Sequence, residues 1–135
     1  MAVATPLIMI VDDEELFVNL VSYFLVHEGY ATISCTDSTE AYRIVLEHNP
    51  SLIILDLQLG NPMSGLVLLD LIRLDPLTKH IPIVICSGAT SLIATTERRL
   101  RRQGCTILEK PFELDVLLGH VQAAIGPPLR TNAVG

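Results

Sequence analysis

Apolar residues along the chain follow two periodicities that alternate with each other. Short apolar or alternating runs, typical of β-strands, lie at residues 7–11, 31–35, 52–56, 83–86 and 105–109. After most runs, apolar residues recur at spacings of three and four, which predicts amphipathic helices. Their apolar faces contain Phe17, Leu20, Val21 and Phe24; Ala41, Ile44, Val45 and His48; Leu68, Leu69 and Ile72; and Leu114, Leu117, Leu118 and Val121.

The helix boundaries have weaker signals. The first helix is expected to end near Gly29, and the second to follow Ser38 and stop at Asn49–Pro50. Residues 91–102 also predict a helix, but with only a weak amphipathic pattern.

Five strand–helix units in succession predict an α/β fold, with a parallel sheet covered by helices on both faces. The runs at 7–11, 52–56 and 83–86 are continuously apolar, as expected for central strands buried on both sides. The runs at 31–35 and 105–109 include Thr, Ser or Glu, which edge strands tolerate. A doubly wound, five-stranded sheet in the flavodoxin-like order 2-1-3-4-5 is therefore predicted.

Composition narrows the functional classes. The 135 residues fit one domain, expected over residues 1–125, with 126–135 as a flexible C-terminal tail or truncated linker. A net charge of −6 argues against nucleic acid as the main ligand, and the apolar runs are too short to span a membrane. A cytoplasmic location is expected. The three cysteines lack a CxxC spacing and are expected to be buried thiols.

Polar residues follow four of the predicted strands and carry the candidate chemistry. They are Asp12, Asp13, Asp56, Ser87 and Lys110. Ligands of such sheets bind beyond the carboxyl ends of the strands, so these five side chains are expected to converge. Three clustered carboxylates suit a hard divalent cation such as Mg²⁺, and the amine and hydroxyl can hold a phosphoryl group.

Simpler interpretations exist for single residues. Glu14 and Glu15 are best explained as acids at the start of a helix, and the two aspartates before them could serve the same purpose. Ser87 before Gly88 could be a turn residue, and Lys110 a solvated surface lysine.

The motifs "VDDEE", "LIILDL", "CSGA" and "EKPF" resemble the receiver domain of bacterial two-component response regulators, of the single-domain, chemotaxis-regulator-like kind. The resemblance covers residues ~7 to ~125. It implies that Asp56 accepts a phosphoryl group from a phosphohistidine on a sensor kinase or phosphotransfer protein. It further implies that Lys110 and Ser87 contact that group, and that the Lys110–Pro111 peptide bond is cis.

The same resemblance implies a ligand set for Mg²⁺. Asp13 would bind directly and Asp12 mainly through bound water. The acceptor Asp56 and the backbone carbonyl of Gln58 would complete the protein ligands.

The chain departs from the family pattern at three places. Ile107 occupies a position where many relatives have a Tyr or Phe that rotates on activation. Gly60 and Ser64 stand where relatives usually have Pro and Gly, and Gly65 comes one residue late. The arginines Arg98, Arg99, Arg101 and Arg102 are unusual on this helix; a solvated face is favoured over a docking site for an acidic partner.

Two other functions stay open. One is a receiver-like adaptor that works without phosphorylation. The other is a small phosphatase with an aspartyl intermediate, although Gln58 stands where such an enzyme would need a second acid. The favoured interpretation is a switch that promotes only its own phosphorylation and dephosphorylation, with an unidentified downstream protein target and a homodimer linked to phosphorylation as a further expectation.

Overall fold

The computed structural model describes residues 5–59 and 64–128, in which five strands alternate with five helices. The strands are β1 (Leu7–Val11), β2 (Ala31–Cys35), β3 (Leu52–Leu55), β4 (Ile83–Ser87) and β5 (Cys105–Glu109). The helices are α1 (Glu15–His27), α2 (Ser38–His48), α3 (Gly65–Leu74), α4 (Thr90–Arg102) and α5 (Leu114–Ile125). Every element expected from the sequence is present.

The strands form one parallel sheet in the order β2-β1-β3-β4-β5, which confirms the predicted topology and both predicted edge strands. In this register Val11 of β1 lies opposite Leu55 of β3, and Leu55 opposite Ile85 of β4. The carboxyl ends of the central strands are therefore level, so the residues that follow them meet at one edge.

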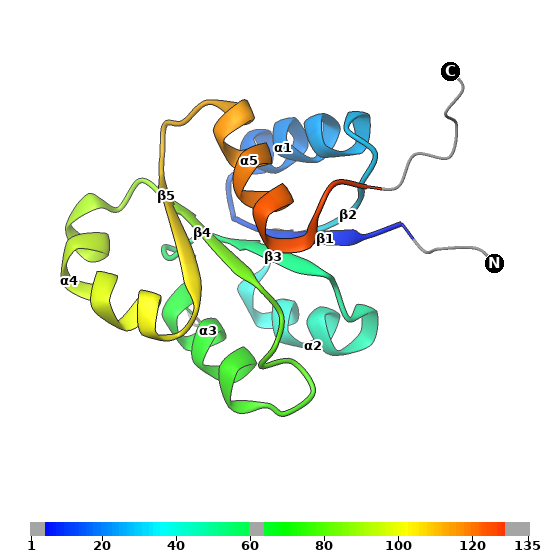
Figure 1. Ribbon diagram of the computed structural model, residues 1–135. Coiled ribbons are helices and arrows are strands. Elements are labelled where there is room, and N and C mark those ends of the chain that lie inside the picture. The colour runs from blue at the N-terminus through cyan, green and yellow to red at the C-terminus, as the bar shows by residue number, and fades with distance from the viewer. Residues whose placement is uncertain (1–4, 60–63, 129–135) are drawn as a thin grey trace, which may run out of the picture.

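Successive strand residues point to opposite faces and build two separate cores. On one face α1 and α5 pack over side chains such as Ile8, Ile10 and Ile54. On the other face α2, α3 and α4 pack over neighbours such as Met9 and Ile53. Figure 1 shows α1 and α5 together above the sheet and α2 and α3 below it, with α4 toward the β5 edge. Helices on both faces are confirmed.

Helix boundaries differ from the expected ones in detail. Asp37 rather than Ser38 caps α2: its carboxylate accepts a hydrogen bond from the Thr39 N–H at 2.9 Å, and Ser38 is the first, buried residue of the helix. His48, expected on the apolar face, is exposed because α2 ends there and Asn49 turns the chain with a φ of 44°.

The expectation that α4 is only weakly amphipathic is wrong. Ile93 and Leu100 are buried, and Leu92, Thr96 and Arg99 on the same side are half-buried, so the helix has one continuous inner face. The pattern is hard to recognise from the sequence because Thr96 and Arg99, which are polar residue types, occupy part of that face.

Other expectations concern single features. All three cysteines are buried and free. Within the described ranges, none of the helices is both long enough and apolar enough to cross a bilayer. The Tyr30 hydroxyl donates to the Gly126 carbonyl at 2.9 Å, so the chain just after α5 contacts the α1–β2 turn. Residues 129–135, and Gly60 in the β3–α3 loop, lie outside the described part.

Candidate functional site

Three carboxylates gather at the carboxyl edge of the sheet, as predicted. Asp12 and Asp13 follow β1 and Asp56 follows β3; one oxygen from each lies within 4.8 Å of the others. Asp12 and Asp56 are only 1% and 8% exposed, whereas Asp13 is exposed. The cluster thus has a buried floor and one open side.

Hydrogen bonds of the backbone hold the two buried acids in place. The Asp12 N–H donates to the Cys35 carbonyl at 3.2 Å, and the Asp56 N–H donates to the Val11 carbonyl at 3.0 Å. One carboxylate oxygen of each acid then accepts the N–H two residues ahead: Asp12 Oδ1 from Glu14, and Asp56 Oδ1 from Gln58. The other oxygen of each carboxylate, Oδ2, points to the side where Lys110 lies, at 2.7 Å for Asp12 and 3.5 Å for Asp56.

Lys110 supplies the positive charge on this edge. Its Nζ lies 2.7 Å from Asp12 Oδ2, 3.5 Å from Asp56 Oδ2 and 3.7 Å from Glu14 Oε1. Its backbone N–H donates to the Ser87 carbonyl, which continues the β4–β5 ladder, and the Lys110–Pro111 bond is cis as expected. Lys110 is therefore held in the sheet rather than free on the surface.

One ammonium does not balance the buried acids. Burial raises the pKa of Asp12 above its ordinary value, and the hydrogen bonds from Lys110 and the Glu14 N–H do not cancel that effect. Burial by itself would lower the pKa of Lys110, yet Asp12, Asp56 and Glu14 together raise it. Ionised Asp12 is thus costly here, and a second cation would stabilise the site. Carboxylate oxygens are the donors that Mg²⁺ prefers, so the residues present fit that ion.

Ser87 is fully buried at the end of β4, beside this edge. Its Oγ accepts the Ala89 N–H at 3.1 Å, which is the turn role considered from the sequence. No hydrogen bond between Ser87 and the three carboxylates is found among the described residues. A hollow of about 500 Å³ lined by Gln58, Gly88 and Ala89 lies at the same edge, where small side chains leave space.

Two aromatic residues lie next to Lys110: Phe112, which belongs to the motif "EKPF", and Phe17, for which the sequence predicts only a place on the apolar face of a helix. The Lys110 ammonium lies 4.0 Å from the centre of the Phe17 ring, and Phe112 packs edge-on against Phe17 with centroids 6.0 Å apart. Phe17 was counted as a core residue of α1, and nothing in its spacing distinguishes it from one. Leu20 and Pro111 join these residues around a groove of about 230 Å³.

Gly65 packs closely against the backbone of Asp56 and Leu57, the acceptor segment. A Cβ placed on it would lie 2.2 Å from the Asp56 carbonyl oxygen and 2.7 Å from Leu57 Cα. Its N–H donates to the Leu57 carbonyl, while the Ser64 hydroxyl accepts the Val67 N–H and caps α3. The sequence marked Gly65 only as a departure in spacing; the close backbone approach explains why this position holds glycine.

Ile107 lies half-buried in β5 and packs with the core on the α3–α4 side. Its position in β5, opposite Ile85 of β4, agrees with the sequence. Its effect on switching stays a prediction.

Comparisons with known proteins agree with this arrangement. A family model described as the response regulator receiver domain matches residues 8–122. The chain is 30% identical over 123 residues to the polar-differentiation response regulator DivK of Brucella ovis, covering 90% of this chain and 98% of the relative.

Solved structures of response regulators are also similar to this chain. The chemotaxis protein CheY4 of Vibrio cholerae superposes with a TM-score of 0.80 at 26% identity, covering 90% of this chain and all of that one. NtrX of Brucella abortus gives a TM-score of 0.77 at 31% identity; the match covers 90% of this chain but 27% of NtrX.

Proposed function

Because the chain belongs to the response regulator receiver domain family, we propose that Asp56 is the residue that accepts the phosphoryl group. The chain is a phosphorylation-dependent switch of two-component signalling. The observation that supports the assignment of Asp56 is a carboxylate oxygen that is not yet hydrogen-bonded. Both oxygens of Asp12 accept hydrogen bonds, from the Glu14 N–H and from Lys110, whereas Asp56 Oδ2 accepts none from the described residues and lies 3.5 Å from the Lys110 ammonium.

The reaction needs positioning and charge neutralisation more than acid–base chemistry. A free oxygen of the Asp56 carboxylate attacks the phosphorus of a phosphohistidine, the P–N bond breaks, and the imidazole leaves with its electron pair. Lys110, 3.5 Å from Asp56, stabilises negative charge on the incoming phosphoryl oxygens. Mg²⁺ would supply further positive charge, held by Asp13 directly, by Asp12 mainly through water, and by the carbonyl of Gln58.

Ser87 is proposed to sense the product. We propose that the Ser87 side chain turns toward a phosphoryl oxygen and away from the Ala89 N–H, from which its Oγ now accepts a hydrogen bond. That hydrogen bond holds the loop from β4 to α4, so its loss changes the equilibrium position of α4.

Phosphorylation by a small donor tests the acceptor. With acetyl phosphate and Mg²⁺, we expect the wild type to gain one base-labile phosphate, detected as intact mass and lost on alkaline treatment. Asp56→Asn should gain none. Asp75→Asn is the control, because Asp75 lies after α3 and bonds to Tyr42 instead. Equal phosphate incorporation by Asp56→Asn would contradict the assignment.

The donor is proposed to be a sensor histidine kinase or phosphotransfer protein that docks on α1. Leu16, Leu20 and Tyr23 on this helix are 82%, 55% and 71% exposed, an unusual run of apolar surface. Leu20 and Lys110 line the same groove, so a protein bound there places its phosphohistidine next to Asp56.

A charged residue introduced on α1 distinguishes docking of the protein donor from the phosphoryl transfer to Asp56. Leu20→Asp should slow phosphorylation by a protein donor by tenfold or more while leaving acetyl phosphate reactivity unchanged, because only the protein donor contacts α1. Val67→Asp, at a similarly exposed position on α3, is the control. Equal slowing with both donors would show instead that the substitution disturbs the site.

Hydrolysis of a soluble phosphoester tests the phosphatase alternative. We propose that the chain turns over no separate substrate, so no such hydrolysis is expected.

The adaptor alternative, in which the chain works without phosphorylation, predicts identical partner binding by wild type and Asp56→Asn. A cytoplasmic location and a phosphorylation-linked homodimer stay predictions.

A further inference from the structure

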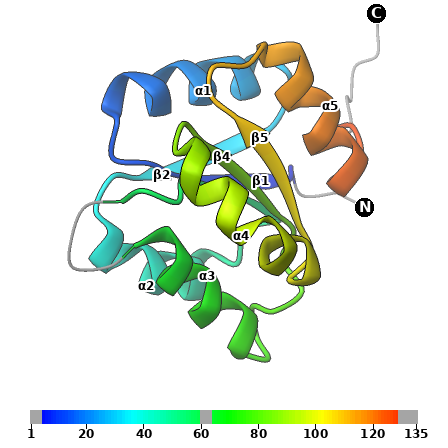
Figure 2. The same ribbon diagram turned by 90° about the vertical axis from the view of Figure 1, so that its left-hand side faces the viewer.

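We propose that the end of the domain opposite Asp56 carries a second interaction surface, which binds an acidic segment of a partner protein. The surface lies where β4 and β5 begin, between the α3–β4 loop and the α4–β5 turn. Figure 2 shows these two connections close together beneath α4. A pocket of about 610 Å³ opens there and is lined by Arg73, Lys79, His80, Arg102, Gln103 and Gly104.

Positive charge is concentrated at this end of an acidic chain. Of the nine Lys and Arg residues, six belong to α3, α4 or the loop between α3 and β4: Arg73, Lys79, Arg98, Arg99, Arg101 and Arg102. Because the net charge is −6, the remaining surface is strongly acidic. The stretch from α3 to α4 also contains the acids Asp70, Asp75 and Glu97, so cations outnumber acids there, whereas acids outnumber cations over the rest of the chain.

The pocket is a fixed structure rather than a chance arrangement of long side chains. The Arg73 guanidinium donates to the Gln103 carbonyl at 2.7 Å, to the Ile81 carbonyl at 2.7 Å and to the Lys79 carbonyl at 3.0 Å. One side chain therefore joins α3, the α3–β4 loop and the end of α4, and it holds the pocket walls at a constant separation.

The cations on the walls are available to a ligand. Arg99 and Arg101 bind Asp70 and Glu97, and Arg43 on α2 binds Glu40 and Glu47. Lys79 and Arg102 differ: both are exposed, and no carboxylate partner for either is found in the described part of the chain. Two unneutralised cations face one pocket from opposite sides.

Apolar side chains border the same surface. Leu74, the last residue of α3, and Leu77, in the loop that follows, are 80% and 72% exposed. Leu77 and His80 line a neighbouring hollow of about 240 Å³ against α2, and His80 lines the basic pocket as well. The two hollows therefore form one continuous surface, with an apolar half beside a cationic half.

This combination fits a protein segment with carboxylates and one or two apolar anchors. Nucleic acid fits less well, because the basic area is confined to one end and the rest of the chain repels a long polyanion. Leucine side chains also have no role against a phosphate backbone. Since the surface lies at the amino ends of the strands, binding there does not need phosphorylation of Asp56.

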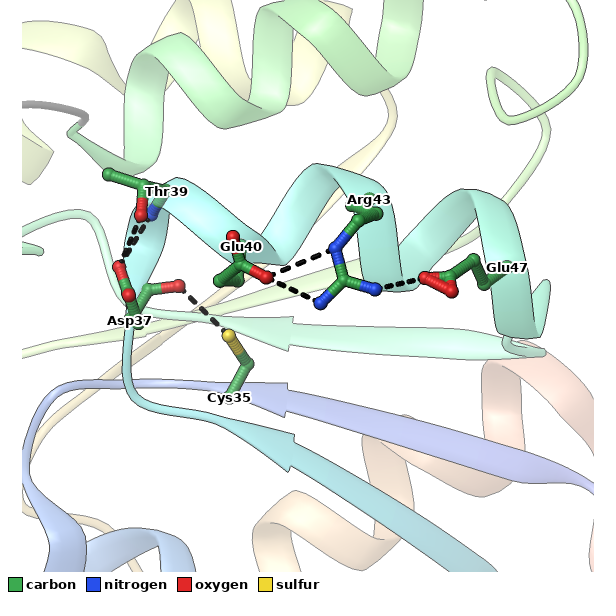
Figure 3. A network of polar contacts seen from close by, with 6 residues as sticks. All are labelled: Cys35, Asp37, Thr39, Glu40, Arg43 and Glu47. Carbon is green, nitrogen blue, oxygen red and sulfur yellow. Dashed lines mark hydrogen bonds and ion pairs between the residues drawn. The ribbon is translucent and has the colours of Figure 1, made fainter.

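A labelled peptide of repeated Glu-Glu-Leu units, titrated with the unphosphorylated protein and followed by fluorescence anisotropy, tests the proposal. Arg102→Glu should weaken binding about tenfold. The matched control is Arg43→Glu, which changes the net charge equally on α2, where Glu40 and Glu47 surround the arginine (Figure 3). This control should change the affinity less than twofold. Leu77→Ala should also weaken binding, and Val116→Ala on α5 should not.

Several results would overturn the proposal. They are no binding by the wild type, equal weakening by Arg102→Glu and Arg43→Glu, or tighter binding of a duplex DNA oligonucleotide than of the peptide. Phosphorylation by acetyl phosphate should be the same in Arg102→Glu and wild type, which separates this surface from the function proposed for Asp56. Circular dichroism of each variant confirms that the fold is retained.

Discussion

Single residues at this site matter through the backbone they support as well as through their charges. Gly65 illustrates this, because its missing side chain allows α3 to begin directly against the carbonyl of Asp56. Any larger residue has to displace backbone rather than a flexible side chain.

Alanine at two glycine positions should therefore have opposite effects. Gly65→Ala should lower the free energy of unfolding by about 1–3 kcal/mol and also slow phosphorylation of Asp56, because its Cβ pushes on the acceptor segment. Gly119→Ala, in the exposed middle of α5 with no atom within 4 Å of the added Cβ, should raise the free energy of unfolding by about 0.5–1 kcal/mol. Urea unfolding of both variants measures the difference, and the same sign at both positions would contradict this account.

The polar residues that form the site were its most predictable part. Asp12, Asp13, Asp56 and Lys110 could be placed together because each follows a strand whose end is fixed by a strong apolar pattern. Phe17 could not, because its contact with Lys110 depends on a rotamer and on the turn after β5. The spacing of apolar residues within α1 does not indicate the rotamer of Phe17 or the course of the turn after β5.

At the scale of elements, hydrogen bonds between side chains connect α3 to α4. Asp70 of α3 accepts hydrogen bonds from Arg99 and Gln103, at the carboxyl-terminal end of α4. The hydrogen bond from Arg99, together with that from Gln103, lowers the pKa of Asp70 below its ordinary value of 3.8. The amino end of α4, next to Ser87, has no comparable polar link to α3 among the described residues, so the polar connection between the two helices is confined to the carboxyl end of α4, while Ile93 packs in the core nearer the amino end.

The stability supplied by this link should depend on pH. Because the pKa of Asp70 is lower in the folded state, its contribution is complete above pH 3.8 and is lost as the pH falls through the lowered value. Asp70→Asn should destabilise the domain by about 0.5 kcal/mol at pH 7, a small effect because the pair is partly exposed. The difference from wild type should disappear in acid.

Unfolding of four proteins at two pH values checks this: wild type, Asp70→Asn, Arg99→Gln and the double variant. In the Arg99→Gln background, Asp70→Asn should have a much smaller effect. Glu109→Gln, at an exposed acid on β5, serves as the control. Additive effects of the two substitutions would mean that the ion pair contributes nothing.

Element order and type were predictable from the sequence, whereas the inner face of α4 was not. The central strands β1, β3 and β4 are almost purely apolar, so their composition alone predicts that they are buried. On α4 the half-buried positions include Thr96 and Arg99, whose position in the helix rather than their chemical type decides how much of each is covered. Tertiary packing therefore determines which face of α4 is buried, which the local sequence pattern leaves ambiguous.

At the scale of the whole molecule, the acid cluster links metal binding to folding. Asp12, Asp13 and Asp56 approach one another only when β1 and β3 are paired, so Mg²⁺ should bind the folded state and not the unfolded chain. At a concentration about 100 times the dissociation constant, the ion should add about 2.7 kcal/mol to the free energy of unfolding.

Calorimetry with and without Mg²⁺ measures this effect. The wild type should melt at a higher temperature with Mg²⁺, and Asp13→Asn should lose most of that increase, because Asp13 is the exposed acid on the open side of the cluster. NaCl at matched ionic strength controls for screening of the net charge. An equal increase in Asp13→Asn would remove Asp13 from the ligand set.

The sequence separation within the site has a consequence for the newly made protein. Asp12 and the lysine that contacts it are 98 positions apart, and the lysine follows the last strand. On the ribosome, the acceptor is thus synthesised well before the amine it needs. A nascent chain cannot become a working receiver part by part, because the site is incomplete until β5 and Lys110 have been translated.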